Sequence, residues 1–485
     1  MLSAQIKFNH SRYSELYDLV IPEDHILRRF HNLVDFSFIY NELENEYCLD
    51  NGRGAKSPIL LFKYLLLKYL YNLSDYGVVE RSKYDLSFKY FLDLAPEDDV
   101  IHPSLLSKFR KQRLKDENLL DLLINKSVEI AIDEGVIKSR SIIVDSTHTD
   151  ARYHKATVRE MLQAESSALR ESLTDAGNET CLPEEPNVHD AYEKHLNYCT
   201  ELIAMAKESP YAEIPNIKEE AELLGEMLDD KIDPFSYSID KDARLGHKSE
   251  SESFYGYKTH IAMTEDRIIT AATITSGETF DGTELPELVK KSRGTGMTVE
   301  EVIADTAYST LDNLKDAKDN NYNLISKLNP KVANGMRSED GFIFNKDADT
   351  MQCPAGHLAV TKNYERRAKV GKNDRIKYYF DIEKCKCCPH REGCYKENAK
   401  SKSYSVTIKS DYHLEQKEFQ STEYFKTRMK ERYKIEAKNS ELKGVHGYDQ
   451  CDSAGLDSMR IQGAVTIFVA NIKRILRLKG EVCPN

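Results

Sequence analysis

The sequence predicts an α/β protein of several domains, in which a sheet-containing core follows an all-α N-terminal domain and is interrupted by two inserts. The chain has 485 residues, 40% of them hydrophobic, which exceeds what one core usually organises. Short β-branched runs alternate with helical patterns from about residue 136 onward. The expected parts are a helical domain (1–135), a core (136–330 and 401–480), an acidic helical insert (154–240) and a Cys-rich insert (331–400).

Targeting signals are not expected. The N-terminal stretch MLSAQIKFNHSRYSELYD lacks an apolar segment after a basic start, and the richest apolar run is broken by Lys63 and Lys68. We therefore expect a soluble, cytoplasmic protein with no membrane partner.

Charge is distributed locally rather than evenly. The net charge is −12, yet residues 154–240 alone carry 7 Lys/Arg against 20 Asp/Glu, a net of −13. The remainder is close to neutral, with 15 Lys/Arg against 10 Asp/Glu between residues 401 and 480. The acidic total therefore does not exclude a nucleic-acid partner.

The N-terminal domain reads as helical. PILLFKYLLLKYLYNL begins with a proline suited to a first helical turn, and HPSLLSKFRKQR is typical of a serine-capped helix with a basic cluster. A DNA-binding helical module fits this pattern, although helix packing and a solvated basic face produce most of it. The candidate DNA contacts in this cluster are Lys108, Arg110, Lys111 and Arg113.

Two carboxylates follow predicted buried strands. SIIVDST is a β-branched run that delivers Asp145, and EEVIADTAYS is a second one that ends in Asp305. Between them, YGYKTHIAMTED and RIITAATITSG predict a hairpin that turns near Asp266, followed by a helix from DGTELPELVKKSRG. A lone acid at a strand end is often only a turn former or a helix cap.

The order of these elements is more specific than any one acid. A strand with an aspartate, two strands, a helix, a strand with an aspartate, a helix and a fifth strand (YNLISKL) precede a later helix that carries Glu436. This is the element order of the ribonuclease H-like fold, and the three carboxylates fall where that fold places metal ligands. We therefore predict a ribonuclease H-like catalytic core.

The helix-like stretch RMKERYKIEAKNSELKGVHGYDQ carries charged residues at helical spacing. Arg432, Glu436 and Lys443 lie at offsets of four and seven residues, which places them on one helical face. An ordinary i,i+4 ion pair on a solvated face would give the same pattern.

Together these motifs resemble bacterial insertion-sequence transposases of the DDE class, in the branch with a Tyr-x2-Arg-x3-Glu-x6-Lys signature. Arg432, Glu436 and Lys443 reproduce three members at that spacing, whereas Met429 stands where the signature has tyrosine. IIVDST, VIADTAYST, IPEDHILRRFHNLVDFSFI and GAVTIFVANIKRILRL also resemble the family, so the similarity extends over most of the chain outside the acidic insert.

The chemistry of such an enzyme explains the residue types. Phosphodiester cleavage and joining need charge relief that two Mg2+ (or Mn2+) ions roughly 4 Å apart supply, and carboxylates are suitable ligands for these hard ions. We assign Asp145, Asp305 and Glu436 to these metals. Arg432 and Lys443 are expected to contact DNA phosphates near the cut.

Cysteines cluster in one window. CPAGH and CKCCPHREGC supply Cys353, Cys385, Cys388 and Cys394 as the expected ligands of a structural Zn2+ ion. Cys387, His357 or His390 could replace one of the four. An iron–sulfur cluster would need the same thiolate ligands. The alternative without a metal is a set of free reduced thiols.

The sequence thus favours a DNA transposase that cuts element ends and joins them to target DNA. Its expected partners are double-stranded DNA, at the inverted-repeat ends and at the target, and other copies of the chain; it is expected to associate with the nucleoid. The alternatives are a DNA-binding descendant that no longer cuts and a ribonuclease H-like nuclease without joining activity.

Overall fold

We describe the fold from a computed structural model of the chain. The described residues are 11–47, 54–114, 118–154, 157–177, 182–186, 192–228, 238–247, 253–328, 341–345, 350–365, 375–391, 394–396, 399–407 and 411–480. The predicted boundary between the core and the Cys-rich insert at residue 330 lies outside these ranges.

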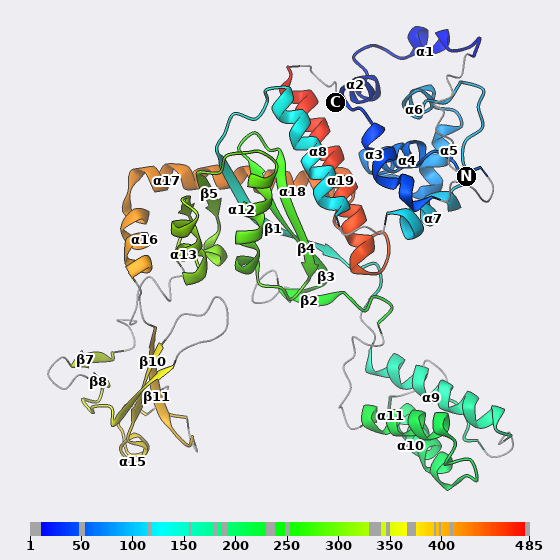
Figure 1. The fold of residues 1–485 in the computed structure, drawn as a ribbon. Helices are drawn as coiled ribbons and strands as arrows, with labels where there is room; N and C mark the ends of the chain where they lie inside the picture. The colour runs from blue at the N-terminus through cyan, green and yellow to red at the C-terminus, as the bar shows by residue number, and fades with distance from the viewer. Residues whose placement is uncertain are drawn as a thin grey trace.

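The N-terminal region is helical, as predicted (Figure 1). Its elements are α1 (Glu15–Val20), α2 (Ile26–Leu33), α3 (Ser37–Leu43), η1 (Glu44–Glu46), α4 (Pro58–Leu70), α5 (Asp75–Ser82), α6 (Leu86–Phe91), α7 (Ser104–Arg113) and α8 (Leu119–Asp133). Helix α4 begins at Pro58 and is buried along almost its whole length. Its two lysines do not reach solvent: Lys63 pairs with Asp93 at 2.5 Å, and Lys68 pairs with Asp75 at 3.0 Å.

A mixed sheet forms the centre of the molecule. Its strands are β1 (Ser141–Asp150), β2 (Arg244–His247), β3 (Ser253–Thr264), β4 (Ile269–Ser276), β5 (Glu301–Ala304) and β6 (Asn323–Ile325). The hydrogen-bonded order is β2-β3-β1-β5-β6, and β4 also pairs with β3. Strands β3 and β4 form the predicted hairpin, whereas β1, β5 and β6 run parallel.

Helices cover both faces of this sheet. Helices α8 and α19 (Leu456–Leu478) lie side by side, pack on β4 and share one apolar cluster with the N-terminal helices (Figure 1). Helices α12 (Leu285–Gly294) and α13 (Leu311–Asp319) share a second cluster with β1 and β5. Two 3-10 turns, η3 (Asp281–Glu284) and η4 (Thr306–Tyr308), lie between these elements. The β-branched residues of β1 and β5 are buried because both sheet faces are covered.

The charged C-terminal stretch differs from one continuous helix. After α16 (Asp411–Ser421) come α17 (Glu423–Met429), η6 (Lys430–Arg432) and α18 (Tyr433–His446). Arg428 ties α17 to the sheet, because its guanidinium donates to Glu301 at 3.0 Å and to Ser141 at 2.9 Å, at the beginnings of β5 and β1. Met429 packs against the apolar core. Met429 ends α17, and the 3-10 turn η6 separates it from α18, so one continuous α-helix does not extend from Met429 to Glu436.

Two lobes lie apart from the sheet (Figure 1). Helices α9 (Val158–Asp175), α10 (Tyr192–Glu208) and α11 (Pro215–Leu228) surround an apolar cluster of their own within the acidic segment. The second lobe contains β7 (Ile343–Asn345), β8 (Thr350–Gln352), β9 (Thr361–Glu365), β10 (Arg375–Phe380), α15 (Ile382–Lys386) and β11 (Lys402–Thr407), with another apolar cluster. Within the described ranges, no helix is both long enough and apolar enough to cross a bilayer.

Candidate functional site

Asp145 and Asp305 lie next to each other because of strand register. Parallel pairing of β1 with β5 stops at Val144 and Ala304, so the next residue on each strand is an aspartate. Strand β5 ends there, but β1 continues to Asp150 along β3. Asp145 therefore lies in mid-strand rather than at the predicted strand end, beside the position that β5 has left open.

Asp305 has a local structural role as well. One of its carboxylate oxygens accepts a hydrogen bond from the Ala307 backbone amide at 2.9 Å, which caps η4. Its carbonyl oxygen accepts from the Ser326 hydroxyl at 2.5 Å. These bonds fix the backbone of Asp305 at the end of β5, so its carboxylate is presented on the same side as Asp145.

Helix α18 occupies the edge of β1 that β5 leaves unpaired. The Asp150 amide donates to the Asp449 carbonyl at 2.9 Å, and the Cys451 amide donates to the Asp150 carbonyl at 2.9 Å. These two bonds join the end of β1 to the segment after α18. Glu436 lies on this neighbouring helix, with its side chain 59% exposed.

Arg432 connects the helix to the sheet. Its Nη1 lies 2.6 Å from Glu436 Oε1, which is the predicted i,i+4 pair, and its Nη2 lies 3.5 Å from Asp145 Oδ2. Its Nε is buried with no hydrogen-bond partner in the described residues. The structure therefore brings Arg432, Glu436 and Asp145 together, with the guanidinium between the two carboxylates.

The electrostatics of the aspartates reflect crowding at a buried edge. The pKa of Asp145 is raised to about 6, chiefly by burial; Arg432 and the Ser146 amide oppose this shift, and nearby Asp305 and Asp281 add to it. Burial also raises the pKa of Asp305. A cation that replaced water beside these groups would lower both pKa values. Crowded carboxylates of this kind are common at functional sites.

Asp281, which the sequence interpretation assigned to an ordinary helix, is a fourth carboxylate near this edge. It accepts from the Ser146 hydroxyl at 2.9 Å and from Lys258 Nζ at 2.9 Å, and it begins η3 rather than the interior of a helix. Tyr308 lies nearby, and its buried hydroxyl has no hydrogen-bond partner among the described residues. No spacing in the sequence links Asp281 to Asp145, because strand pairing alone brings the two segments together.

Lys443 is close to the same strand two turns further along α18. Its Nζ lies 3.1 Å from His148 Nε2, and the His148 ring packs against Phe254 with 4.9 Å between ring centroids. Lys443 thus lies beyond the carboxylates on the side toward the end of β1. The sequence patterns do not predict His148 and Phe254 as site residues.

The basic cluster of α7 divides into two groups. Arg110 makes a bidentate pair with Asp75, at 3.0 and 2.5 Å, and Arg113 donates to the Glu46 carbonyl and stacks on Tyr47. Lys108 and Lys111 are exposed. The two arginines therefore have intramolecular partners that a sequence pattern does not reveal, and DNA contact by any of the four stays a prediction.

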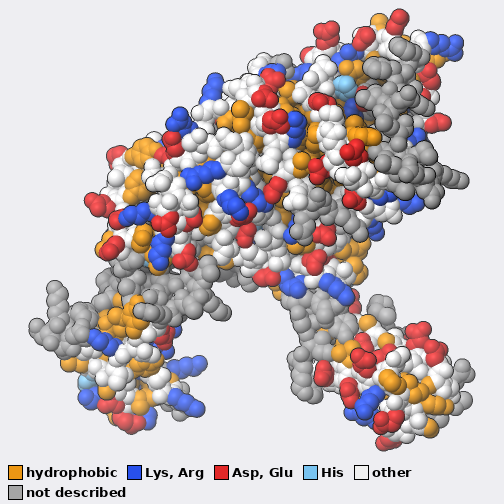
Figure 2. Space-filling view, in the orientation of Figure 1, with side chains coloured by type: hydrophobic (Ala, Val, Ile, Leu, Met, Phe, Trp, Pro, Cys, Tyr) orange, Lys and Arg blue, Asp and Glu red, His pale blue; other side chains and the backbone are white. Residues whose placement is uncertain are grey.

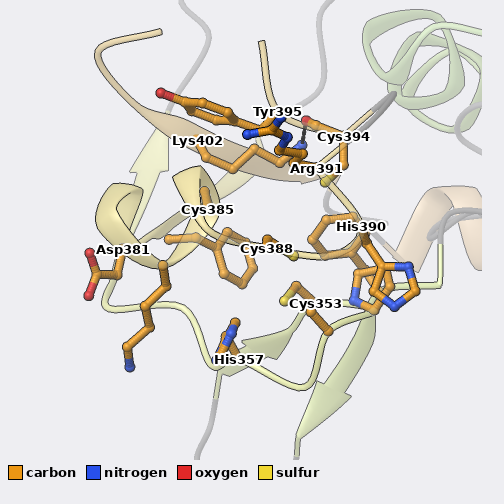
Figure 3. Close-up of a pocket in the computed structure, with 15 residues that line it drawn as sticks. Cys353, His357, Asp381, Cys385, Cys388, His390, Arg391, Cys394, Tyr395 and Lys402 are labelled. Carbon is orange, nitrogen blue, oxygen red and sulfur yellow. Dashed lines mark hydrogen bonds between the residues drawn. The ribbon is translucent and has the colours of Figure 1, made fainter. Parts of the chain in front are cut away.

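The cysteines gather around one pocket of the small β lobe (Figure 3). Tight turns present them: the Gly356 amide donates to the Cys353 carbonyl at 2.8 Å, and the Cys388 amide donates to the Cys385 carbonyl at 3.4 Å. The cavity has a volume of about 30 Å³. Its lining includes Cys353, Cys385, Cys388, Cys394, His357 and His390.

The thiols in this pocket are reduced and mutually close. Burial raises the pKa of Cys385, and the neighbouring Cys394, Cys353 and Cys388 add to that shift, while Cys387 is exposed. Nevertheless, no three His, Cys, Asp or Glu side chains among the described residues are already arranged as ligands of one ion. This holds for the cysteine pocket and for the carboxylate edge alike.

A mixed sheet with two adjacent carboxylates and a charged helix beside it is compatible with a nucleic-acid phosphoryl-transfer site. Comparison with protein families agrees with a site of that class. Residues 14–112 match a family model described as a transposase domain (DUF772), and residues 352–476 match one described as a transposase DDE domain. The two matches support an insertion-sequence-type DDE transposase, and the DDE domain implies a ribonuclease H-like core. No curated protein matches the chain.

Proposed function

We propose that this protein is a DNA transposase that cleaves DNA at the ends of an insertion sequence and joins those ends to target DNA. The observation that carries the proposal is the adjacency of Asp145 and Asp305 at the point where β5 ends, with Glu436 linked to Asp145 through Arg432. The two family matches, the second of which includes Glu436, supply the DNA context.

Metal dependence follows from the DDE family, and we assign the ligands to Asp145, Asp305 and Glu436. The donor chemistry fits: these are oxygen ligands, and burial raises the pKa values of Asp145 and Asp305, a shift that an adjacent cation would oppose. Two Mg2+ (or Mn2+) ions would stabilise charge on the attacking and leaving oxygens. Arg432 pairs with both Glu436 and Asp145, so it has to release Asp145 before that carboxylate can bind a cation.

The freed guanidinium then suits a phosphate of the DNA. Arg432 offers a planar fork of donors for non-bridging oxygens, and Lys443 adds a point charge further along the same helix. Their separation along α18 positions the DNA strand over the carboxylate edge. The exposed Lys108 and Lys111 of α7 are further candidates for contacts to the DNA backbone. Arg110 and Arg113 are candidates as well, but each would first have to leave its present intramolecular partner.

The cysteine pocket is proposed as a structural Zn2+ site held by Cys353, Cys385, Cys388 and Cys394. Four thiols around one small cavity, on turns typical of zinc knuckles, support this ligand set. The thiol side chains must close around the ion, since the described residues do not already hold a ligand arrangement. Elemental analysis of freshly purified protein tests the site directly, and absence of both zinc and iron would refute it.

Partners and location follow from the same proposal. The substrates are the element's inverted-repeat ends and target duplex DNA, with self-association on DNA and residence in the cytoplasm at the nucleoid. Sequencing the DNA that flanks the gene is the first step, because paired inverted repeats identify the substrate for every later assay.

Cleavage of that substrate tests the function. Asp145→Asn, Asp305→Asn and Glu436→Gln are each expected to abolish Mg2+-dependent cleavage while end binding persists. Asp150→Asn is the matched control, because Asp150 is an exposed carboxylate on the same strand that serves the sheet through its backbone. A single variant that cuts at the parental rate removes that residue from the site.

The alternatives give different outcomes in the same assay. A binding-only descendant would bind the ends but leave them uncut with every metal, and a nuclease without joining activity would cut them but leave target DNA intact. Met429, which replaces the tyrosine of the family signature, motivates the first alternative. If the parent protein is inert on its own ends and Met429→Tyr restores cleavage, this chain is a degenerate copy.

A further inference from the structure

Positive charge is concentrated in one short part of the chain. Residues 361–409, which we call the basic lobe, contain 14 Lys/Arg against 6 Asp/Glu, a net charge of +8. Because the whole chain carries −12, all other residues together carry −20. Even the helical N-terminal region, residues 1–135, has 17 Lys/Arg against 22 Asp/Glu, a net of −5. A protein that handles DNA therefore has most of its unbalanced positive charge in the basic lobe.

Much of this charge is on the surface. In the antiparallel sheet β11-β10-β9 and the turns beside it, Lys and Arg side chains project from the exposed face of the lobe (Figure 2). The exposed basic residues that the structure describes there are Lys362, Lys384, Lys386, Arg391, Lys396 and Lys400.

The described acids of the lobe have partners inside it. Glu365 pairs with Arg375 at 2.5 Å, Glu383 pairs with Lys386 at 2.6 Å, and Asp381 caps α15 through the Glu383 amide. These carboxylates therefore neutralise the lobe's own cations or helix end. These three described acids are too few to cancel the positive charge of the lobe.

The chain path connects the basic lobe to the catalytic edge. The lobe follows β6, the strand beside β5 in the sheet, and it leads through α16 and α17 into the helix that carries Glu436 (Figure 1). It is thus inserted between the segment with Asp305 and the segment with Glu436. DNA held by the lobe would remain tethered near the site that cuts it.

We propose that the basic lobe is a surface that binds the phosphate backbone of duplex DNA and supplies most of the protein's electrostatic affinity for it. This rests on the proposed function only in taking DNA as the substrate. Lysines predominate among the exposed cations, and a lysine ammonium is a point charge that suits phosphate oxygens. Contacts to phosphates carry no information about base sequence. Binding through this surface is therefore independent of base sequence and falls steeply with salt, because each phosphate that the protein neutralises releases counterions.

The test measures binding of the full-length protein to a short duplex of arbitrary sequence by fluorescence anisotropy, without divalent metal, across a salt series. The variant K362Q/K396Q/K400Q removes three exposed charges that lie outside the four-cysteine set. Each phosphate that the variant no longer neutralises should reduce the slope of log affinity against log salt by about 0.9. If the variant gives up even one phosphate, affinity near about 0.1 M salt should fall roughly eightfold or more.

Two matched variants separate charge from folding. K194Q/K207Q/K218Q removes three exposed charges from the lobe of α9, α10 and α11, which we call the acidic lobe, and should leave the salt slope unchanged. K362R/K396R/K400R keeps the charge of the basic lobe and should retain the parental slope. If K362Q/K396Q/K400Q does not fold, the single variants K362E, K396E and K400E are used instead, and their salt slopes are compared with that of the parent.

An unchanged slope in K362Q/K396Q/K400Q overturns the proposal. So does a change in sedimentation without a change in slope, which would identify the acidic lobe of a second copy as the partner instead. The transposase proposal is judged separately by cleavage of element ends. The parent protein can fail to cut while the basic lobe still accounts for the salt slope, and it can cut while the basic lobe contributes nothing.

Discussion

Replacing Asp145 with asparagine should stabilise the metal-free protein at neutral pH, although it removes a proposed metal ligand. Burial raises the pKa of Asp145 from 3.8 to about 6, so the folded state holds this proton more tightly than the unfolded chain does. Folding stability therefore falls as pH rises through the window from about 4 to about 6, and the cost is complete above it. A shift of about two pKa units corresponds to about 3 kcal/mol.

This figure already includes the attraction of Arg432, whose Nη2 lies 3.5 Å from the Asp145 carboxylate. The expected stabilisation is therefore about 3 kcal/mol above about pH 7, which lengthens the lifetimes of the slowest amide protons of β1 roughly 150-fold. The effect should disappear below about pH 3, where both states carry the proton.

Hydrogen exchange resolved to β1 is the suitable assay, because a chain with several lobes need not unfold in one step. Asp150→Asn on the same strand is the control and should leave exchange unchanged. Equal exchange of Asp145→Asn and the parent at about pH 7.5, or a difference that persists at about pH 3, would show that Asp145 is not a destabilising buried carboxylate.

Further predictions separate structural from binding roles. Arg110→Ala should lower the free energy of unfolding by about 2 to 3 kcal/mol, because Asp75 then keeps only Lys68 as a partner. Lys111→Ala should change the free energy of unfolding by less than about 0.5 kcal/mol but reduce the salt slope of DNA binding by about 1. Equal effects of the two variants in denaturation would contradict this division. Chelation should release zinc and unfold the small β lobe, seen as a decrease of amide protection in β10, while α19 keeps its protection. The acidic segment should show no protection by DNA, since a net of −13 is repelled by phosphates. Met429→Tyr should leave end cleavage of an active parent within about tenfold, because it alters at most one neutral hydrogen bond, worth about 1 kcal/mol, and no metal ligand.

The sequence predicts the sheet well because its strands have distinctive local signals. The β-branched runs before Asp145 and Asp305 are buried on both faces, which makes them readable as parallel strands. The predicted end of β1 is too early because the polar residues after Asp145 look like a turn. They continue as a strand because β3 and the segment after α18 supply hydrogen-bond partners from distant parts of the sequence.

Side-chain partners are harder to predict than elements. The pair of Arg432 with Glu436 follows from helical spacing, so the sequence contains it. Asp281 joins the site through Ser146 and Lys258, which lie 135 and 23 residues away from it, and no local pattern encodes such contacts. The 3-10 turn Lys430–Arg432 also has no recognisable signal in this charged stretch, so helical spacing cannot be carried across it from the sequence alone.

The cations show why residue type alone does not locate a DNA surface. Arg110 lies in the densest basic cluster of the N-terminal region, yet its guanidinium is used to hold Asp75 between α5 and α7. Its charge is largely cancelled there, because a bidentate pair leaves little field for a phosphate beyond it. Exposed lysines such as Lys396 and Lys400 have ordinary local sequences, but they belong to a lobe with a large positive excess. Attraction of DNA depends on this net positive charge. The net charge of a folded lobe therefore predicts a DNA-binding surface better than a short run of basic residues in the sequence does.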